Sequence, residues 1–248
     1  MCKRYLFTVE YDGTAYCGWQ KQNNGLSVQE VVERAIFKIC GEEASIVGSG
    51  ITDAGVHAYA QVFHTDLSTN IPYRKLPFAL NTALPDDIKI KNCRVVNKDF
   101  NARFSAKEKT YIYKMYISVH ASALRARTHL HVLPGVDAEL MKRGAEYILG
   151  RHDFKCFLAA NSQVKDTVRE VYSINFTKRG DELTMRITGN GFLYNMVRII
   201  VGTLLDVGYG KIAPERVKTI IESGERKFAG KTVAPQGLYL YKIKYKKR

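Results

Sequence analysis

The chain has 248 residues, of which 46% are hydrophobic and 25% are charged, a composition that excludes general disorder. Its 38 Lys and Arg against 24 Asp and Glu give a net charge of +14, which favours a polyanionic partner such as nucleic acid over the alternative of a basic surface that serves solubility alone. No apolar run approaches the roughly 18 residues of a membrane span and the start lacks the apolar core of a signal peptide, so we expect a cytoplasmic protein without a membrane partner.

The first part of the chain predicts strands that alternate with helices. The clearest start belongs to a helix, because Ser27 and Glu30 form a capping-box pattern and apolar residues recur at helical spacing until Gly41. In chain order, the expected elements are a strand over 4–10, this helix over 28–39, a strand over 56–66, a helix over 73–83 and a strand over 88–96.

The second part predicts a similar succession. A hairpin turns at 179–181, and one helix has Pro214 in its first turn and Gly224 just past its end. In chain order, the expected elements are a strand over 110–119, a helix over 137–149, strands over 171–177 and 183–188, helices over 192–207 and 214–223, and a strand over 239–245.

The strands are amphipathic and not continuously apolar, which favours antiparallel sheets backed by helices over a doubly wound parallel fold. We therefore expect an α+β protein of two packed subdomains, residues 1–104 and 105–248. The five cysteines are scattered and form no Cys-x-x-Cys pair, which predicts reduced thiols and argues against a zinc cluster.

The loop over 48–55 contains the most informative residues. Its glycines do not form a dinucleotide fingerprint, because Asp53 stands where the third glycine would be. An aspartate in such a loop, taken alone, is most often a turn former or a helix cap. Its neighbours change that interpretation, because Thr52-Asp-Ala-Gly-Val-His57 closely resembles the active-site signature of TruA-type tRNA pseudouridine synthases.

The resemblance extends along nearly the whole chain as ordered blocks, which are more specific than one motif. The other blocks are Glu10–Thr14, Gly18–Gln22, Ser27–Glu30, Asn101–Ala106, Lys109–Tyr113, Gly150–Phe154, Gly191–Arg198 and Ala234–Leu238.

The resemblance implies an isomerase that converts uridine to pseudouridine in the anticodon stem-loop of tRNA, at positions 38 to 40. It implies no cofactor and no metal, a homodimer, and an active-site cleft between the two subdomains, of which the first carries the catalytic Asp loop. The matching catalytic residues are Asp53, Tyr111 and Arg198. The candidate substrate or RNA-binding residues are Ile51, Thr52, His57, Arg103, Lys109 and Arg169.

The chemistry suits the three catalytic residue types. A carboxylate such as Asp53 can act as a nucleophile or electrostatic partner at the sugar while the N1–C1′ bond breaks and the base is rejoined through C5. Arg198 would hold that carboxylate ionised, and Tyr111 offers a ring to stack on the uracil and a hydroxyl to move a proton. The target base must also be flipped out of its stack, which costs a few kcal/mol.

Each residue also has a plainer interpretation. Tyr111 is one of several alternating strand aromatics, and core packing alone would account for it. Arg198 interrupts an apolar helix, where a structural salt bridge explains it as well as an active-site pair does. His57 and His64 have no catalytic role in this interpretation, and each candidate basic residue is individually more often a solvated side chain.

The sequence departs from the family at Ile51, where the signature normally has an arginine that is expected to assist base flipping. Isoleucine keeps bulk that can wedge into a stack but loses the charge and five hydrogen-bond donors. Two hypotheses follow: an active synthase with an altered grip on RNA, or a tRNA-binding or folding-assistant protein with weak or no catalysis. Retention of Asp53, Tyr111 and Arg198 together favours the active enzyme, and the charge disfavours chemistry on a small molecule.

Overall fold

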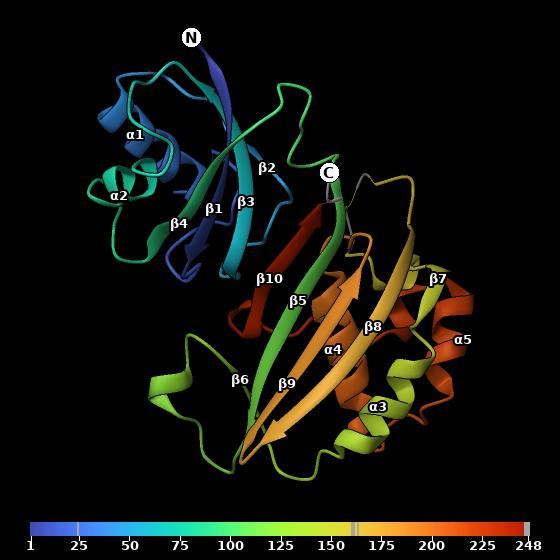
Figure 1. The fold of residues 1–248 in the computed structure, drawn as a ribbon. Coiled ribbons are helices and arrows are strands. Elements are labelled where there is room, and N and C mark those ends of the chain that lie inside the picture. The colour runs from blue at the N-terminus through green and yellow to red at the C-terminus, as the bar shows by residue number, and fades with distance from the viewer. Residues whose placement is uncertain (24, 160–161, 163, 246–248) are drawn as a thin grey trace. The chain divides into compact units, whose positions relative to one another are not determined.

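The computed structural model describes residues 1–23, 25–159, 162 and 164–245, and it contains both helices and strands (Figure 1). The chain divides into two compact units, which are Met1–Lys107 with Tyr239–Arg248 (unit 1) and Glu108–Leu238 (unit 2). The expected division after residue 104 differs from this in two respects, because the boundary lies after Lys107 and the last strand groups with unit 1. Within the described ranges, no helix has the length and apolarity needed to cross a membrane.

Unit 1 is built on strands in the order β4 (Ile88–Val96), β1 (Lys3–Tyr11), β3 (His57–Leu67) and β10 (Leu238–Tyr245), and β2 (Val47–Gly48) also pairs with β3. The β1–β3, β1–β4 and β2–β3 pairs are antiparallel, and the β3–β10 pair is parallel. The helices α1 (Val28–Cys40) and α2 (Leu76–Asn81) lie on one side of these strands (Figure 1).

The α1 helix follows its sequence signals closely. The Ser27 hydroxyl accepts a hydrogen bond from the Glu30 N–H at 3.2 Å, and Gly41 ends the helix in the left-handed conformation with φ 71°. The α2 helix is shorter than the predicted 73–83. Residues 72–75 form a turn before it, and Pro77 lacks the N–H that an interior helical position needs, so it fits only in the first turn.

Unit 2 is built on strands in the order β5 (Ala106–Ile117), β9 (Glu182–Gly189), β8 (Val168–Arg179) and β7 (Gly150–Asp153), and β6 (Leu130–Val132) pairs with β5. Only the β5–β6 pair among these is parallel. The helices are α3 (Ala138–Glu146), α4 (Met196–Gly208) and α5 (Arg216–Ser223). Short 3₁₀ turns lie at Ala123–Arg125, Lys155–Phe157, Arg226–Phe228 and Pro235–Gly237.

The predicted hairpin is confirmed as β8 and β9, which turn at Gly180 with φ 59°. The helix predicted from residue 192 begins at Met196 instead, because Asn195 adopts the left-handed conformation and cannot continue a helix towards the N-terminus. The expected α+β class, with mainly antiparallel sheets backed by helices, is confirmed.

Candidate active site

The loop that carries Asp53 is held at Thr52 by two hydrogen bonds. The Tyr11 hydroxyl lies 2.7 Å from the Thr52 hydroxyl, and the Trp19 backbone N–H donates to the Thr52 carbonyl at 3.1 Å. Thr52 is only 4% exposed, so it acts as the buried anchor of the loop. Asp53 itself is half-buried, and its carbonyl accepts from the Val56 N–H at 3.1 Å, which closes a tight turn directly after it.

Gly18 lies against the same loop and explains why its position has no side chain. Its φ is 112°, a value that L residues rarely adopt. A Cβ atom there would lie 2.6 Å from the Thr52 carbonyl oxygen and 3.2 Å from the Asp53 carbonyl carbon. The backbone at Gly18 therefore packs directly against the backbone at Thr52 and Asp53, and a side chain at position 18 would push the two segments apart.

His57 begins β3 directly after the loop, and it is 2% exposed. Its Nδ1 lies 3.0 Å from both the Gly13 N–H and an Asp12 carboxylate oxygen, and its ring stacks on Tyr239 at 4.6 Å. Partial burial acts to raise the pKa of Asp12, but hydrogen bonds from Thr14 and the nearby His57 outweigh burial and lower it. This geometry makes His57 a support for the turn at Gly13, and direct contact with RNA would require it to be uncovered.

The two remaining candidate RNA contacts of unit 1 are accessible. Ile51 is 51% exposed, two residues before Asp53. Arg103 is exposed on the loop that joins β4 to β5, and its N–H is held by the Asn101 side chain at 2.9 Å.

The two candidates in unit 2 differ from each other. Lys109 is half-buried on β5, where it lies opposite Gly189 of β9. Arg169 on β8 donates to the carbonyls of Asp166 and Val168 at 3.0 and 2.7 Å. One terminal nitrogen of its guanidinium is therefore already hydrogen-bonded to the local backbone.

Tyr111 lies on β5, opposite Ile187 of β9, and is 9% exposed. Its ring meets the edge of Phe192 at 5.3 Å between centroids and 87° between planes. An edge-to-face contact fixes the ring in one orientation. Phe192 belongs to the same segment as Arg198, so the stretch of sequence that carries Arg198 also contacts the Tyr111 ring.

Arg198 lies in the first turn of α4 and is half-buried. Its Nε donates to the Val233 carbonyl at 2.8 Å, and a terminal nitrogen donates to the Asn195 side-chain carbonyl at 2.6 Å. Asn195 has φ 59°, and it is the one non-glycine residue with positive φ in the described part of the chain. Asparagine adopts this conformation more readily than other non-glycine residues, because its short polar side chain can form local hydrogen bonds, as it does here with Arg198.

Tyr113, two residues after Tyr111, completes this support. It is fully buried, and its hydroxyl donates to the Ala234 carbonyl at 2.6 Å. Burial raises the pKa of Tyr113, and the positive charge of Arg198 opposes that rise. Tyr113 and Arg198 therefore hold the segment 233–234 between them.

The sequence interpretation missed these supporting residues. The available signals were the position of Tyr113 on the same strand face as Tyr111, and an asparagine directly before an apolar helix. Tyr11 and Trp19 carried a weaker signal, since aromatic residues in a strand and a turn are usually core.

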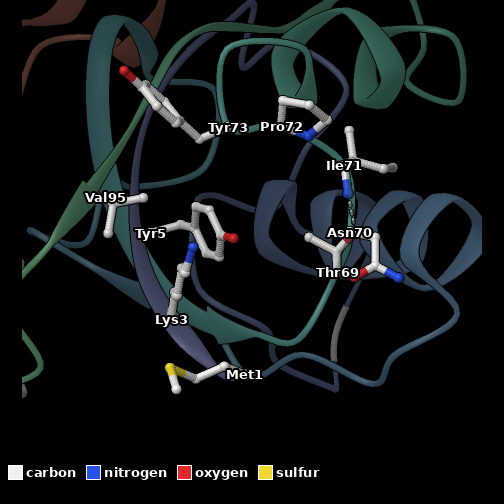
Figure 2. A pocket seen from close by; sticks show the side chains of 9 residues that line it. All are labelled: Met1, Lys3, Tyr5, Thr69, Asn70, Ile71, Pro72, Tyr73 and Val95. Atoms are coloured by element: carbon white, nitrogen blue, oxygen red, sulfur yellow. Dashed lines mark hydrogen bonds between the residues drawn. The ribbon is translucent and has the colours of Figure 1, made fainter.

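A separate pocket in unit 1 has a volume of about 300 Å³ and opens at the start of β1 (Figure 2). Its lining includes Lys3, Tyr5, Asn70 and Tyr73, and none of the candidate site residues. The described residues contain no group of three or more His, Cys, Asp or Glu side chains arranged to hold a metal ion.

Comparison with known proteins gives consistent matches. The pattern of a family described as tRNA pseudouridine synthase matches residues 7–105 and 145–246. The chain is 46% identical to tRNA pseudouridine synthase A of Ruminiclostridium cellulolyticum, over 98% of this chain and 100% of that protein. It is 47% identical to the protein of that name from Caldicellulosiruptor bescii over 98% and 100%, and 42% identical to the one from Bacillus subtilis over 98% and 99%.

Proposed function

This chain belongs to the tRNA pseudouridine synthase family, and from that membership we propose that Asp53 is its catalytic nucleophile. The protein is an isomerase that converts uridine in tRNA to pseudouridine. The alternative, a tRNA-binding or folding-assistant protein without catalysis, is not favoured, because relatives matched over almost their whole length are named as synthases. The observation that supports Asp53 most directly is its half-buried place on a loop anchored at Thr52 and crowded by Gly18.

The reaction requires one bond to break and another to form at the same carbon. In this proposal the Asp53 carboxylate attacks C1′, and the N1–C1′ bond breaks with its electron pair leaving on the uracil. The uracil rotates, C5 attacks C1′, and the carboxylate leaves. The proton on C5 is then lost and N1 is protonated, so atoms and electrons balance without a cofactor or a metal.

Tyr111 and Arg198 act on the same uridine in this proposal. The Tyr111 ring stacks on the uracil, and its hydroxyl is suited to carry the proton that leaves C5. Arg198 supplies the positive charge that keeps a carboxylate ionised and stabilises the uracil anion. The supporting observation is that each side chain is fixed by named neighbours, Phe192 for the tyrosine and Asn195 for the arginine.

The target uridines proposed here are positions 38 to 40 of the anticodon stem-loop, which the family resemblance implies. Ile51, Thr52, His57, Arg103, Lys109 and Arg169 are the residues proposed to shape or contact the RNA. We further propose a homodimer, for which sedimentation at twice the 28.1 kDa of one chain is the expected result and a single-chain mass the contrary one. A cytoplasmic location is proposed on the ground that all five cysteines are free thiols.

Asp53→Asn tests the catalytic assignment, because an amide has nearly the same shape as the carboxylate but is not a nucleophile. We expect turnover to be abolished while the dissociation constant for unmodified tRNA stays within about twofold of the wild type. Pseudouridine is mapped by chemical adduct formation, which also identifies the modified positions. Asp86→Asn is the matched control, since Asp86 is a fully exposed carboxylate on a turn.

Persistent turnover in the Asp53→Asn protein would remove Asp53 from the mechanism. Product at positions other than 38 to 40 would contradict the proposed target and leave the nucleophile unaffected.

A further inference from the structure

Phe104 is an apolar side chain with no cover on the surface of unit 1. It is 80% exposed, and it lies beside the exposed Arg103 on the loop between β4 and β5. Single exposed apolar side chains are common on protein surfaces, so exposure alone does not mark an interaction site. Phe104 is distinguished by the ordered turn that presents it and by the charge of its neighbours in the sequence.

The backbone that presents Phe104 is ordered by Asn101. The Asn101 side-chain carbonyl accepts from the N–H groups of Arg103 and Phe104 at 2.9 and 3.1 Å. The Asn101 backbone carbonyl accepts from the Ser105 N–H at 2.9 Å, and the Ser105 hydroxyl accepts from the Asn101 N–H at 3.2 Å. The exposed ring therefore stands on a closed turn whose N–H groups are satisfied.

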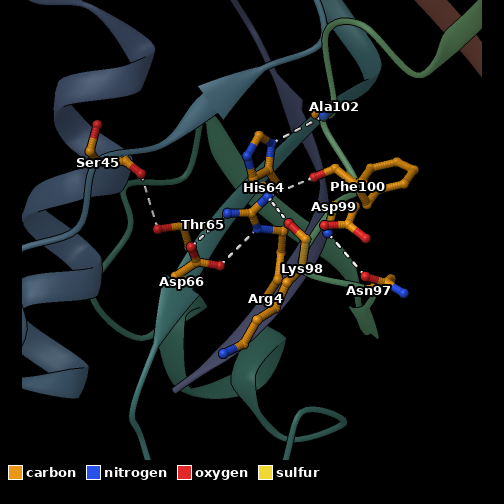
Figure 3. A network of polar contacts seen from close by, with 10 residues as sticks. All are labelled: Arg4, Ser45, His64, Thr65, Asp66, Asn97, Lys98, Asp99, Phe100 and Ala102. Atoms are coloured by element: carbon orange, nitrogen blue, oxygen red, sulfur yellow. Dashed lines mark hydrogen bonds and ion pairs between the residues drawn. The ribbon is translucent and has the colours of Figure 1, made fainter.

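That turn is anchored to the sheet at Ala102, which is fully buried. The Ala102 N–H donates to His64 Nδ1 at 3.1 Å, and its carbonyl accepts from the Tyr245 hydroxyl at 2.9 Å. Arg4 ties down the preceding residues by donating to the carbonyls of Lys98 and Phe100, as Figure 3 shows.

Arg4 is in turn held by a two-pronged ion pair with Asp66, at 2.8 and 2.7 Å. His64, which accepts from Ala102, lies on β3 opposite Val47 of β2. β2 leads directly into the loop that carries Asp53. The Phe104 turn and the Asp53 loop are therefore attached to the same pair of strands within unit 1.

The charges around the ring favour a nucleotide. Between residues 97 and 107 the exposed cations are Lys98, Arg103 and Lys107, and Asp99 is the one carboxylate. An apolar ring next to an arginine, in a loop with an excess of exposed cations, matches a flat base linked to phosphates, whereas the centre of a protein interface is depleted of lysine.

We propose that Phe104 stacks on an unpaired base of the tRNA substrate while Arg103 contacts a neighbouring phosphate. This rests on the proposed function and extends it to a base-stacking contact. Because the turn is already ordered, little conformational entropy is lost when the base docks, and most of the stacking energy is retained as affinity.

Phe104→Ala is the first test, with the full-length chain and an unmodified tRNA transcript. We expect KM and the dissociation constant to rise about 5- to 150-fold, which corresponds to about 1–3 kcal/mol at 1.36 kcal/mol per tenfold. The turnover number at saturating tRNA stays near the wild-type value, because stacking acts equally on bound substrate and transition state. Phe78→Ala is the matched control, since Phe78 on α2 is 77% exposed and we expect no change in affinity.

Two further variants separate stacking from plain hydrophobic contact and from charge. Phe104→Tyr keeps the ring and should restore affinity, whereas Phe104→Leu should not. Arg103→Gln should lower the slope of log affinity against log salt by about one, and Phe104→Ala should leave that slope unchanged.

Wild-type affinity in the Phe104→Ala protein, or full rescue by leucine, would overturn the proposal. So would a changed sedimentation mass with intact tRNA affinity, because it would assign the ring to contact between copies of the chain. These outcomes are distinct from failure of the proposed function, which is measured by turnover of the Asp53→Asn protein.

Discussion

Ile51 carries an exposed apolar side chain two residues before Asp53, where the family resemblance leads us to expect an arginine. The Thr52 that separates them is buried and bonded to Tyr11, so the loop is anchored independently of residue 51. A change at Ile51 is therefore expected to leave the anchor of Asp53 in place, and any effect on RNA is expected to come from the exposed side chain itself.

Ile51→Arg is expected to raise the single-turnover rate on unmodified tRNA by about tenfold or more. The reason is that one charge-assisted hydrogen bond contributes about 1.5 kcal/mol or more. Rapid-quench measurement of pseudouridine formation checks it, with Ile51→Leu as the control that preserves bulk without charge. A rate equal to or below the wild type would show that isoleucine is already the effective residue here.

The surroundings of the candidate residues differed in how far the sequence could predict them. Asp53 was predicted from a contiguous signature, and the tight turn after it is local, because its carbonyl accepts from the Val56 N–H and Gly55 supplies a positive φ. The support of Arg198 could not be identified in that way. Its partner Val233 is 35 residues away, and the left-handed Asn195 breaks the helical pattern that the apolar residues predict.

The loop between β4 and β5 is held to the sheet by a buried histidine, His64. His64 accepts a hydrogen bond at Nδ1 from Ala102, which requires that nitrogen to be unprotonated. Burial, and next the charge of Arg4, lower the pKa of His64 below its ordinary value of 6.5, while Asp66 opposes them. The folded protein thus favours neutral His64, whereas in the unfolded chain the pKa of this histidine has its ordinary value.

The free energy of unfolding is therefore expected to decrease as pH falls below about 6.5. In that window the unfolded chain binds the proton first, and the stability is lost as pH approaches the lower folded pKa. His64→Gln keeps a carbonyl acceptor without titrating, so its stability should fall less steeply between about pH 7 and 5. Urea unfolding at a series of pH values measures both proteins, and parallel curves would contradict the role given to His64.

For the molecule as a whole, the charge predicts how tRNA binding responds to salt. Thirty-eight cationic side chains against 24 anionic ones favour displacement of counterions from phosphates. A footprint of about six phosphates would weaken binding about 10³-fold between about 50 and 200 mM salt. Filter binding over that range checks the expectation, and an affinity independent of salt would contradict an electrostatic contact with the tRNA backbone.

The sequence by itself determined the class of fold, most strands and helices, and the family. These depend on local patterns, namely alternation, helical spacing, caps such as Ser27 and Gly41, and ordered motifs around Asp53. Only the tertiary structure decided that the last strand pairs with β3, that Asn195 and Val233 fix Arg198, and that Asn101, His64 and Tyr245 present Phe104. Those contacts join residues that local spacing does not relate, because hydrogen bonds between distant segments depend on how the whole chain packs.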